Sequence, residues 1–351
     1  MLTKPLTFST LIMSLGLGTT IVFAGKHLVL AWMGLVINSF CILPLMTFKG
    51  NPRATEAAVK YALVQIAAGS IMMLAVTINA STVGSWDFDM LSNPFAVLVL
   101  IVALALKLGL APLHFWMPGV LQGLDLKTGL LVATWQKLAP FALLLYVSHD
   151  CAIFMIFLGV TSAVVAMFGG ILNTQIRKIM AYSSIGHLGW MALVLQFNYR
   201  LALVGMAIYV ILTTATFLLL NRDKNSILTV AALAWMGNPM FIALGPFILL
   251  SLAGIPPLTG FIPKFLITFE LVTQIQLFLA LVMTYASVFI TYFYFRIGYL
   301  VTLMKMPAFS SGALRWRKKG KSGPTLFAIF TLGSLMLLPL TPAIAAIAYY
   351  W

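Results

Sequence analysis

Three lysines lie inside stretches that are otherwise apolar, and each has a proline nearby. Lys107 lies in FAVLVLIVALALKLGLAPLHFWMP, Lys137 in TGLLVATWQKLAPFALLLYV, and Lys264 in GIPPLTGFIPK. A lysine at the centre of a bilayer costs roughly 2.5–3.5 kcal/mol, so an intramembrane lysine usually has a function. Desolvation lowers the pKa of a buried lysine by up to roughly 3–5 units, into the range where an amine gains and loses protons. These lysines therefore predict an ion path.

Two histidines and one glutamate are further candidates for such a path. His114 follows Lys107 by seven residues, or two helical turns, which places both on roughly the same face of a continuous helix. His187 lies in AYSSIGHLGW. Either imidazole can relay a proton, or it can be a hydrogen-bonded packing histidine. Glu270 is the only acidic residue well inside a predicted span, and it serves the outer exit of a path or lies near the outer headgroups.

Several kinds of chemistry have no signal in this sequence. There is no Walker loop, dinucleotide fingerprint, CxxC array or pair of haem histidines, and Cys41 and Cys151 are isolated. We therefore expect no redox centre, no metal and no cofactor in this chain. The net charge of +14 comes from basic residues scattered among apolar spans, which indicates orienting loop charges and not a nucleic-acid partner.

The composition predicts an all-α polytopic membrane protein. Hydrophobic residues make up 62% and charged residues 8% of the 351 residues, too few charges to cover a soluble domain. At about 20 residues a span, there is room for about eleven transmembrane helices. We expect spans at about 5–25, 27–46, 57–80, 95–117, 128–147, 151–172, 177–196, 200–220, 240–272, 276–301 and 325–349.

Prolines predict interruptions in three of these spans, because proline lacks an N–H and crowds the preceding turn. Pro112 should break or kink the fourth span and Pro140 the fifth, while Pro256 and Pro257 should divide the ninth into two half-helices. The more polar stretch 221–239 is expected to be a loop with a short interfacial helix at about 228–236.

Loop charges predict the orientation of the chain. If the N-terminal side is called the inner side, the outer loops hold only two basic residues, Lys26 and Arg200. The inner segments hold Lys4, Lys49, Arg53, Lys60, Lys127, Arg177, Lys178, Arg222, Lys224, Lys305, Arg315, Arg317, Lys318, Lys319 and Lys321. This asymmetry is a strong positive-inside signal, and an odd number of spans places the C-terminus outside.

The spacing of the broken spans suggests an internal repeat within a single transmembrane domain, residues 1–351. One five-helix unit would cover about 5–147 and a second about 151–301, followed by a C-terminal helix at about 325–349. Because five is odd, the second unit is inverted, and the broken helix is the fourth member of each. Interrupted helices at matching positions of inverted halves indicate a transport site.

Five motifs resemble one family over essentially the whole chain. They are NPRATEAAVKY, KLGLAPLHFWMP, TWQKLAP, RKIMAYSSIGHLGWM and SLAGIPPLTGFIPKF. They strongly resemble the NADH dehydrogenase subunit 2 family, antiporter-like membrane subunits of mitochondrial respiratory complex I. The resemblance places Lys107, Lys137 and Lys264 on the family's channel lysines, and His114 and His187 on its histidine positions.

The resemblance also implies a setting for the chain. It implies a multi-pass protein of the mitochondrial inner membrane, with the N-terminus in the matrix and the C-terminus towards the intermembrane space. The partners would be other membrane subunits of complex I, including neighbouring antiporter-like subunits, together with lipids. NADH, FMN, iron–sulfur clusters and ubiquinone would be bound by other subunits, whose electron transfer drives proton translocation.

Two positions depart from the family pattern. The second span of the family typically reads GLE-x-N, with a glutamate that partners the lysine of the fourth span, whereas this chain has Val36 there. The segment often read as PEV has Pro118, Gly119 and Val120. The usual carboxylate–lysine mechanism therefore cannot operate unchanged at Lys107.

Two alternatives to a proton-translocating subunit stay open. One is a free-standing cation/proton antiporter subunit, which shares the fold. The other is a structural scaffold with a decayed channel, which Val36 favours and the three lysines oppose.

Overall fold

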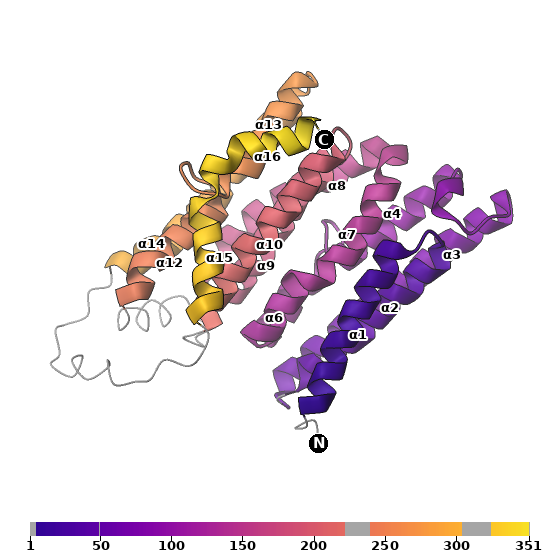
Figure 1. Ribbon diagram of the computed structural model, residues 1–351, viewed down its shortest axis with the longest axis horizontal. Helices are drawn as coiled ribbons and strands as arrows, with labels where there is room; N and C mark the ends of the chain where they lie inside the picture. The colour runs from indigo at the N-terminus through magenta and orange to yellow at the C-terminus, as the bar shows by residue number, and fades with distance from the viewer. Residues whose placement is uncertain (1–4, 49, 222–238, 304–323, 351) are drawn as a thin grey trace. The chain divides into compact units, whose positions relative to one another are not determined.

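The computed structural model describes residues 5–48, 50–221, 239–303 and 324–350. The chain divides into two compact units, Met1–Ser162 and Ala163–Trp351. Within the described ranges the regular structure is helical (Figure 1), and His27 and Asp87 form an isolated β-bridge. The predicted all-α class is confirmed.

The first unit is built on three long helices that pack in order along the chain. Its helices are α1 (Pro5–Ala24), α2 (Leu28–Thr47), α3 (Pro52–Val83), α4 (Pro94–Leu108), α5 (Trp116–Gly123), α6 (Leu126–Ala133), α7 (Trp135–Val147) and the start of α8 (Ala152–Leu172). α1 packs on α2, and α2 on α3, side by side in Figure 1. A Cβ on Gly18 would lie 2.9 Å from the Gly34 carbonyl oxygen, so α1 and α2 touch backbone to backbone.

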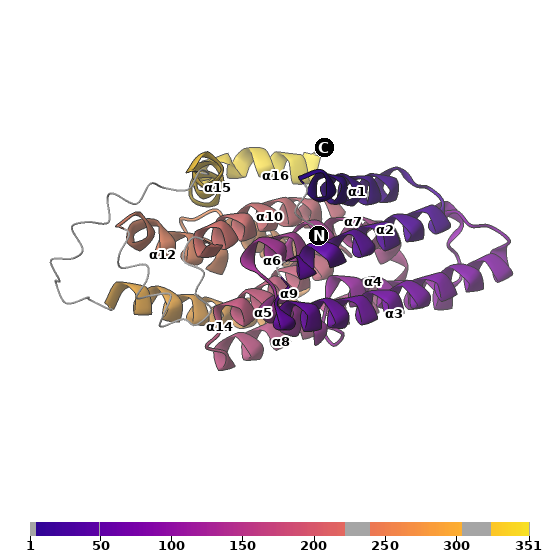
Figure 2. The ribbon, with the colours of Figure 1, turned by 90° about the horizontal axis from the view of Figure 1, so that it is seen from below.

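The second unit surrounds α10 and α9. Its helices are α9 (Ile176–Val194), α10 (Tyr199–Asn221), α12 (Pro239–Ala253), α13 (Phe261–Thr273), α14 (Leu277–Leu303), α15 (Pro324–Met336) and α16 (Thr341–Tyr350), besides the remainder of α8. α10 packs against α9, α12, α13, α15 and α16, and most of α9 is buried. α15 and α16, drawn in yellow, meet at an angle in Figures 1 and 2.

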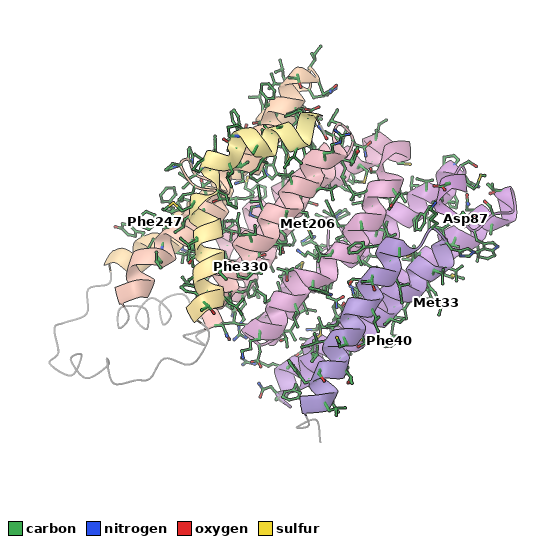
Figure 3. The ribbon with its side chains drawn as sticks, in the orientation of Figure 1. Met33, Phe40, Asp87, Met206, Phe247 and Phe330 are labelled. Atoms are coloured by element: carbon green, nitrogen blue, oxygen red, sulfur yellow. The ribbon has the colours of Figure 1, made fainter. Side chains whose placement is uncertain are left out.

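Length and apolar character suit these helices to a membrane. Among the described residues, seven helices are long and apolar enough to cross one, or eight if the bent pair α15 and α16 counts as one span. The predicted fourth and ninth spans are divided into shorter helices and so fall outside this count. Large apolar side chains remain exposed, among them Met33 and Phe40 on α2 and Phe247 on α12 (Figure 3).

The fourth and ninth spans are broken, as predicted, but each helix ends before its prolines. α4 ends at Leu108 and α12 at Ala253. These are the residues four positions before Pro112 and Pro257, whose carbonyl groups a proline ring would crowd in a continuing helix. Glycine then takes the left-handed conformation that ends a helix, with φ of 76° at Gly109 and 81° at Gly254.

One expectation about another span is wrong. Pro140 does not break its helix but lies inside α7, while the interruption falls at Thr134, between α6 and α7. α7 restarts at Trp135, so the proline ring faces only the first turn of a new helix.

The C-terminal span, expected at about 325–349, has a bend that the sequence did not indicate: α15 and α16 meet at 58° around Leu338–Leu340. Pro339 lies in this bend, and the buried hydroxyl of Thr259 is inserted into the helix ladder before it. Thr259 Oγ1 donates to the Gly333 carbonyl (3.1 Å) and accepts from the Leu337 N–H (3.4 Å). A side chain inserted between two ladder partners is a recognised cause of a kink.

The interfacial helix predicted at about 228–236 lies outside the described residues, as do Lys4, Lys49, Arg222, Lys224 and the basic residues from Lys305 to Lys321. The inverted repeat stays a prediction.

Candidate functional site

Lys107 lies at the C-terminal end of a half-helix, and its side chain is only 4% exposed. The N–H groups of Gly109 and Leu110 both donate to the Ala105 carbonyl, at 2.9 and 3.0 Å, which closes α4. The Nζ atom of Lys107 donates to Oε1 of Gln65 on α3 at 3.4 Å. The ammonium group therefore meets a neutral amide oxygen, and the residue lies in the last turn of α4, where the helix dipole favours a positive charge.

The turn after α4 is held from both sides by hydroxyl groups of α8. Ser162 Oγ accepts from the Ala111 N–H at 2.9 Å, and Thr161 Oγ1 donates to the Ala111 carbonyl at 3.0 Å. His114 lies in this turn and is buried, with its ring centre 4.5 Å from that of Phe115. Because α4 has already ended, the expected shared helix face of Lys107 and His114 does not exist.

Lys137 is the most deeply buried of the described lysines of the first unit, at 2% exposure on α7, which packs against α1, α2 and α4. The neighbouring residue, Gln136, joins three helices. Its Oε1 accepts from the Tyr61 hydroxyl at 3.2 Å, and its Nε2 donates to the backbone and side-chain oxygens of Asn38, each at 3.2 Å. α2, α3 and α7 are thus tied together by polar groups directly beside Lys137.

In the second unit, Lys264 reaches back across the break in its span. The Nζ atom of Lys264, on α13, donates to the carbonyl of Ala253, the last residue of α12, at 2.6 Å. The N–H groups of Gly254 and Ile255 both donate to the Leu250 carbonyl, at 3.2 and 3.3 Å. Lys264 therefore caps the negative end of a half-helix with its ammonium group.

The two breaks share a local pattern that our sequence analysis missed. Residues 109–114 read GLAPLH, and residues 254–259 read GIPPLT. In both, a left-handed glycine and its successor donate to one carbonyl, four residues before the glycine. The signal was a glycine three residues before a Pro-Leu pair.

The other candidates in the second unit lie on helices packed against each other. α13, which carries Lys264 and Glu270, packs on α9, which carries His187. The ring of His187 lies 5.6 Å from that of Tyr209. Glu270 is buried and accepts a hydrogen bond from Gln274 Nε2 at 3.2 Å. Lys107 and Lys137 likewise lie on packed helices, α4 and α7.

The described part of the chain has no group of three or more His, Cys, Asp or Glu side chains that could hold a metal ion.

Comparison with known proteins shows the family to which the chain belongs. Residues 25–291 match the model for NADH:quinone oxidoreductase and Mrp antiporter membrane subunits, and residues 291–345 match NADH dehydrogenase subunit 2 C-terminus. The chain belongs to the NADH dehydrogenase subunit 2 family.

Relatives match this chain over nearly its full length. NADH-ubiquinone oxidoreductase chain 2 of Carassius auratus is 46% identical, covering 97% of this chain and 98% of its own length. The protein of the same name from Aquarana catesbeiana is 45% identical, covering 97% and 99%. These matches and the apolar helices make the chain an integral membrane protein.

Solved structures share the fold. A chain of respiratory complex I from Thermus thermophilus superimposes with a TM-score of 0.85 at 27% identity, covering 97% of this chain and 80% of that one. A chain of the membrane-bound sulfane sulfur reductase has a TM-score of 0.80 at 17% identity, covering 97% and 74%, which shows the fold alone.

Within this family, the departure at Val36 gains a structural setting. Val36 is half-buried on α2, one turn before Ser39, whose hydroxyl donates to the Val36 carbonyl at 2.8 Å. The amide and hydroxyl groups of Gln65, Tyr61 and Gln136 were not singled out from the sequence. Neutral polar residues are common in helices, and only the packing of α3 against α4 and of α7 against α2 shows which ones meet.

Proposed function

We propose that the chain is a core membrane subunit of NADH:ubiquinone oxidoreductase that contributes to proton translocation across the membrane. Lys107, Lys137 and Lys264 are the groups that take up and release protons, with His114 and His187 as relays and Glu270 near one exit. No redox step takes place on this chain.

One observation carries the proposal: two of the three buried lysines are associated with the C-terminal end of a half-helix, Lys107 by its position and Lys264 by its hydrogen bond. Lys107 is in the last turn of α4, and Lys264 donates to the last carbonyl of α12. Broken helices in a membrane are tolerated where they line a cavity or an ion path. A buried amine there is in the setting that transporters use for coupling ions.

The setting of the subunit follows from the same proposal. The chain lies in the mitochondrial inner membrane, with its N-terminus on the matrix side and its C-terminus towards the intermembrane space. Its partners are the other membrane subunits of complex I, including neighbouring antiporter-like subunits, and lipids. NADH, FMN, iron–sulfur clusters and ubiquinone belong to other subunits, and this chain binds no cofactor.

Substitution of Lys137 tests this proposal. We expect Lys137→Ala to reduce proton pumping per NADH oxidised in membrane vesicles, while the complex assembles to the normal level on a native gel. Lys127→Ala is the matched control, because Lys127 lies on α6 ten residues earlier and is exposed. Assembly without loss of pumping in Lys137→Ala would contradict the proposal.

The same experiment separates the alternative functions. A scaffold with a decayed channel, favoured by Val36, would pump normally with any of the three lysines replaced, provided that assembly is normal. A free-standing antiporter would fold and transport cations when it is isolated in mild detergent without partners.

A further inference from the structure

No carboxylate forms an ion pair with Lys107 in the described part of the first unit. The acidic residues of this unit are Glu56, Asp87, Asp89, Asp125 and Asp150. α2, α4 and α7 contain no acidic residue, and Glu56, in the first turns of α3, is exposed and paired with Lys60. The side-chain partner that α3 presents to Lys107 is the amide of Gln65, which is itself only 7% exposed.

A small cavity adjoins Gln65 between α2 and α3. It has a volume of about 10 Å³, is partly open, and has Ser39, Tyr61 and Gln65 among its lining residues, beside apolar ones that include Phe40 and Leu43. One buried water needs roughly 10–15 Å³ and two to four polar partners. The cavity is therefore just large enough for a single water.

Donors and acceptors around the cavity can be assigned without conflict. The amide oxygen of Gln65 accepts from Lys107, which leaves its amide nitrogen to donate. The hydroxyl proton of Tyr61 is given to Gln136, which leaves the Tyr61 oxygen to accept. A water in the cavity would accept from Gln65 and donate to Tyr61, and so complete the chain of bonds.

We propose that Gln65 is the residue that positions Lys107 in this chain, in place of the carboxylate absent at position 36, and that one ordered water joins Gln65 to Tyr61. The resulting network runs from Lys107 through Gln65, the water and Tyr61 to Gln136, beside Lys137. Both lysine-bearing helices of the first unit are thereby coupled through neutral groups. This inference rests on the proposed function, because it concerns how Lys107 is held for proton translocation.

The test is proton pumping per NADH in membrane vesicles that contain the assembled complex. Gln65→Met keeps the length of the side chain but removes both amide groups. We expect coupled turnover to fall roughly tenfold or more, the change that corresponds to losing one hydrogen bond to a charged group. Gln276→Met is the matched control, because Gln276 is exposed.

Combining substitutions distinguishes positioning from general damage. We expect the double variant Gln65→Met with Lys107→Met to pump no worse than Lys107→Met alone, because both act on the same group. We also expect Val36→Glu to restore pumping in the Gln65→Met background, since it returns a partner to Lys107. Additive losses, or no restoration by Val36→Glu, would overturn the inference.

The experiments distinguish a failure of the positioning role of Gln65 from a failure of the proposed function. Normal pumping in Lys107→Met would contradict both, whereas impaired Lys107→Met with normal Gln65→Met would contradict the positioning role alone. The water has its own test, which does not depend on any variant. A high-resolution map of the wild-type complex should show a water within hydrogen-bond distance of both Tyr61 and Gln65, and a dry cavity would overturn that part.

Discussion

Replacement of Gly254 by alanine should separate the cost of backbone strain from the function of Lys264. Gly254 has a φ of 81°, and a Cβ there would lie 2.9 Å from the Nζ atom of Lys264. The lysine end must therefore move away from the Ala253 carbonyl, to which it is bonded at 2.6 Å. The left-handed conformation costs an alanine about 1–2 kcal/mol. A lost hydrogen bond to a charged group adds about 1.5–3 kcal/mol, which gives roughly 2.5–5 kcal/mol in all.

Two other left-handed glycines provide controls with matched backbones. Gly84, at the end of α3, has a φ of 77°, and a Cβ added there would meet nothing within 4 Å, so Gly84→Ala carries the backbone cost alone. Gly109, at the end of α4, has a φ of 76°, and its Cβ would meet Met117 Sδ at 3.2 Å, with no lysine among its nearest neighbours. The excess loss in Gly254→Ala over both controls measures the contribution of the displaced lysine.

The assay has two readouts on the assembled complex. Heat inactivation of NADH oxidation reports stability, and proton uptake per NADH in vesicles reports coupling. All three variants should inactivate at lower temperature than the wild type, and Gly254→Ala should in addition lower pumping per NADH, whereas Gly84→Ala, which lies outside both breaks, should leave pumping unchanged. Equal effects of Gly84→Ala and Gly254→Ala on pumping would refute the reasoning, because the hydrogen bond between Lys264 and the Ala253 carbonyl would then not contribute to pumping.

Two further substitutions test the hydroxyl groups that hold the broken helices. Thr259→Val should lower the heat stability of the complex by about 1 kcal/mol or more, because it removes the hydroxyl that bonds to the half-buried Gly333 carbonyl and Leu337 N–H. Thr259→Ser should restore stability, and an unchanged inactivation temperature in Thr259→Val would count against the kink mechanism. Ser162→Ala should cost a similar amount by leaving the buried Ala111 N–H without its acceptor, and should lower pumping as the turn loosens. Ser162→Thr should retain pumping, and wild-type behaviour of Ser162→Ala would show that this hydroxyl is dispensable.

The membrane architecture could be predicted from the sequence because its signals are one-dimensional. A run of about 20 apolar residues has the same meaning wherever it occurs. A lysine within such a run stands out without any knowledge of its neighbours, and for this reason Lys107, Lys137 and Lys264 were found and are buried in the structure.

The position and character of the breaks were harder to predict, because proline acts at a distance along the helix. Pro112 and Pro257 lie four residues beyond the helix ends, and the glycines in between form the actual caps. Pro140 shows the converse, since a helix that restarts shortly before a proline can accommodate it. The bend in the C-terminal span depends on the hydroxyl of Thr259, which is remote in sequence from α15.

The polar network around Lys107 was beyond sequence reasoning for the same physical reason. Gln65 and Lys107 are 42 residues apart, and Tyr61 and Gln136 are 75 apart. A neutral amide costs little to place in a helix, so nothing in its local sequence marks it as a partner. The sequence contained one indication: with valine at position 36, Lys107 lacks the carboxylate partner that is typical of the family, so another group must hold it.

The magnitudes indicate how a lysine can stay charged beside such a break without a carboxylate. A close carboxylate stabilises a charged amine by one to three pKa units, or about 1.4–4 kcal/mol. A partly buried helix C-terminus contributes up to about 2 kcal/mol to a neighbouring cation. A hydrogen bond from a charged group adds about 1.5–3 kcal/mol. Lys107 lies in the last turn of α4 and has the Gln65 oxygen at 3.4 Å, which is longer than a typical charge-assisted hydrogen bond, so the two together offset part of the missing partner. Lys264 obtains the dipole contribution and the hydrogen bond from one group, because its acceptor is the last carbonyl of α12. At Lys264, breaking the helix places the negative end of a dipole where the amine can bond to it.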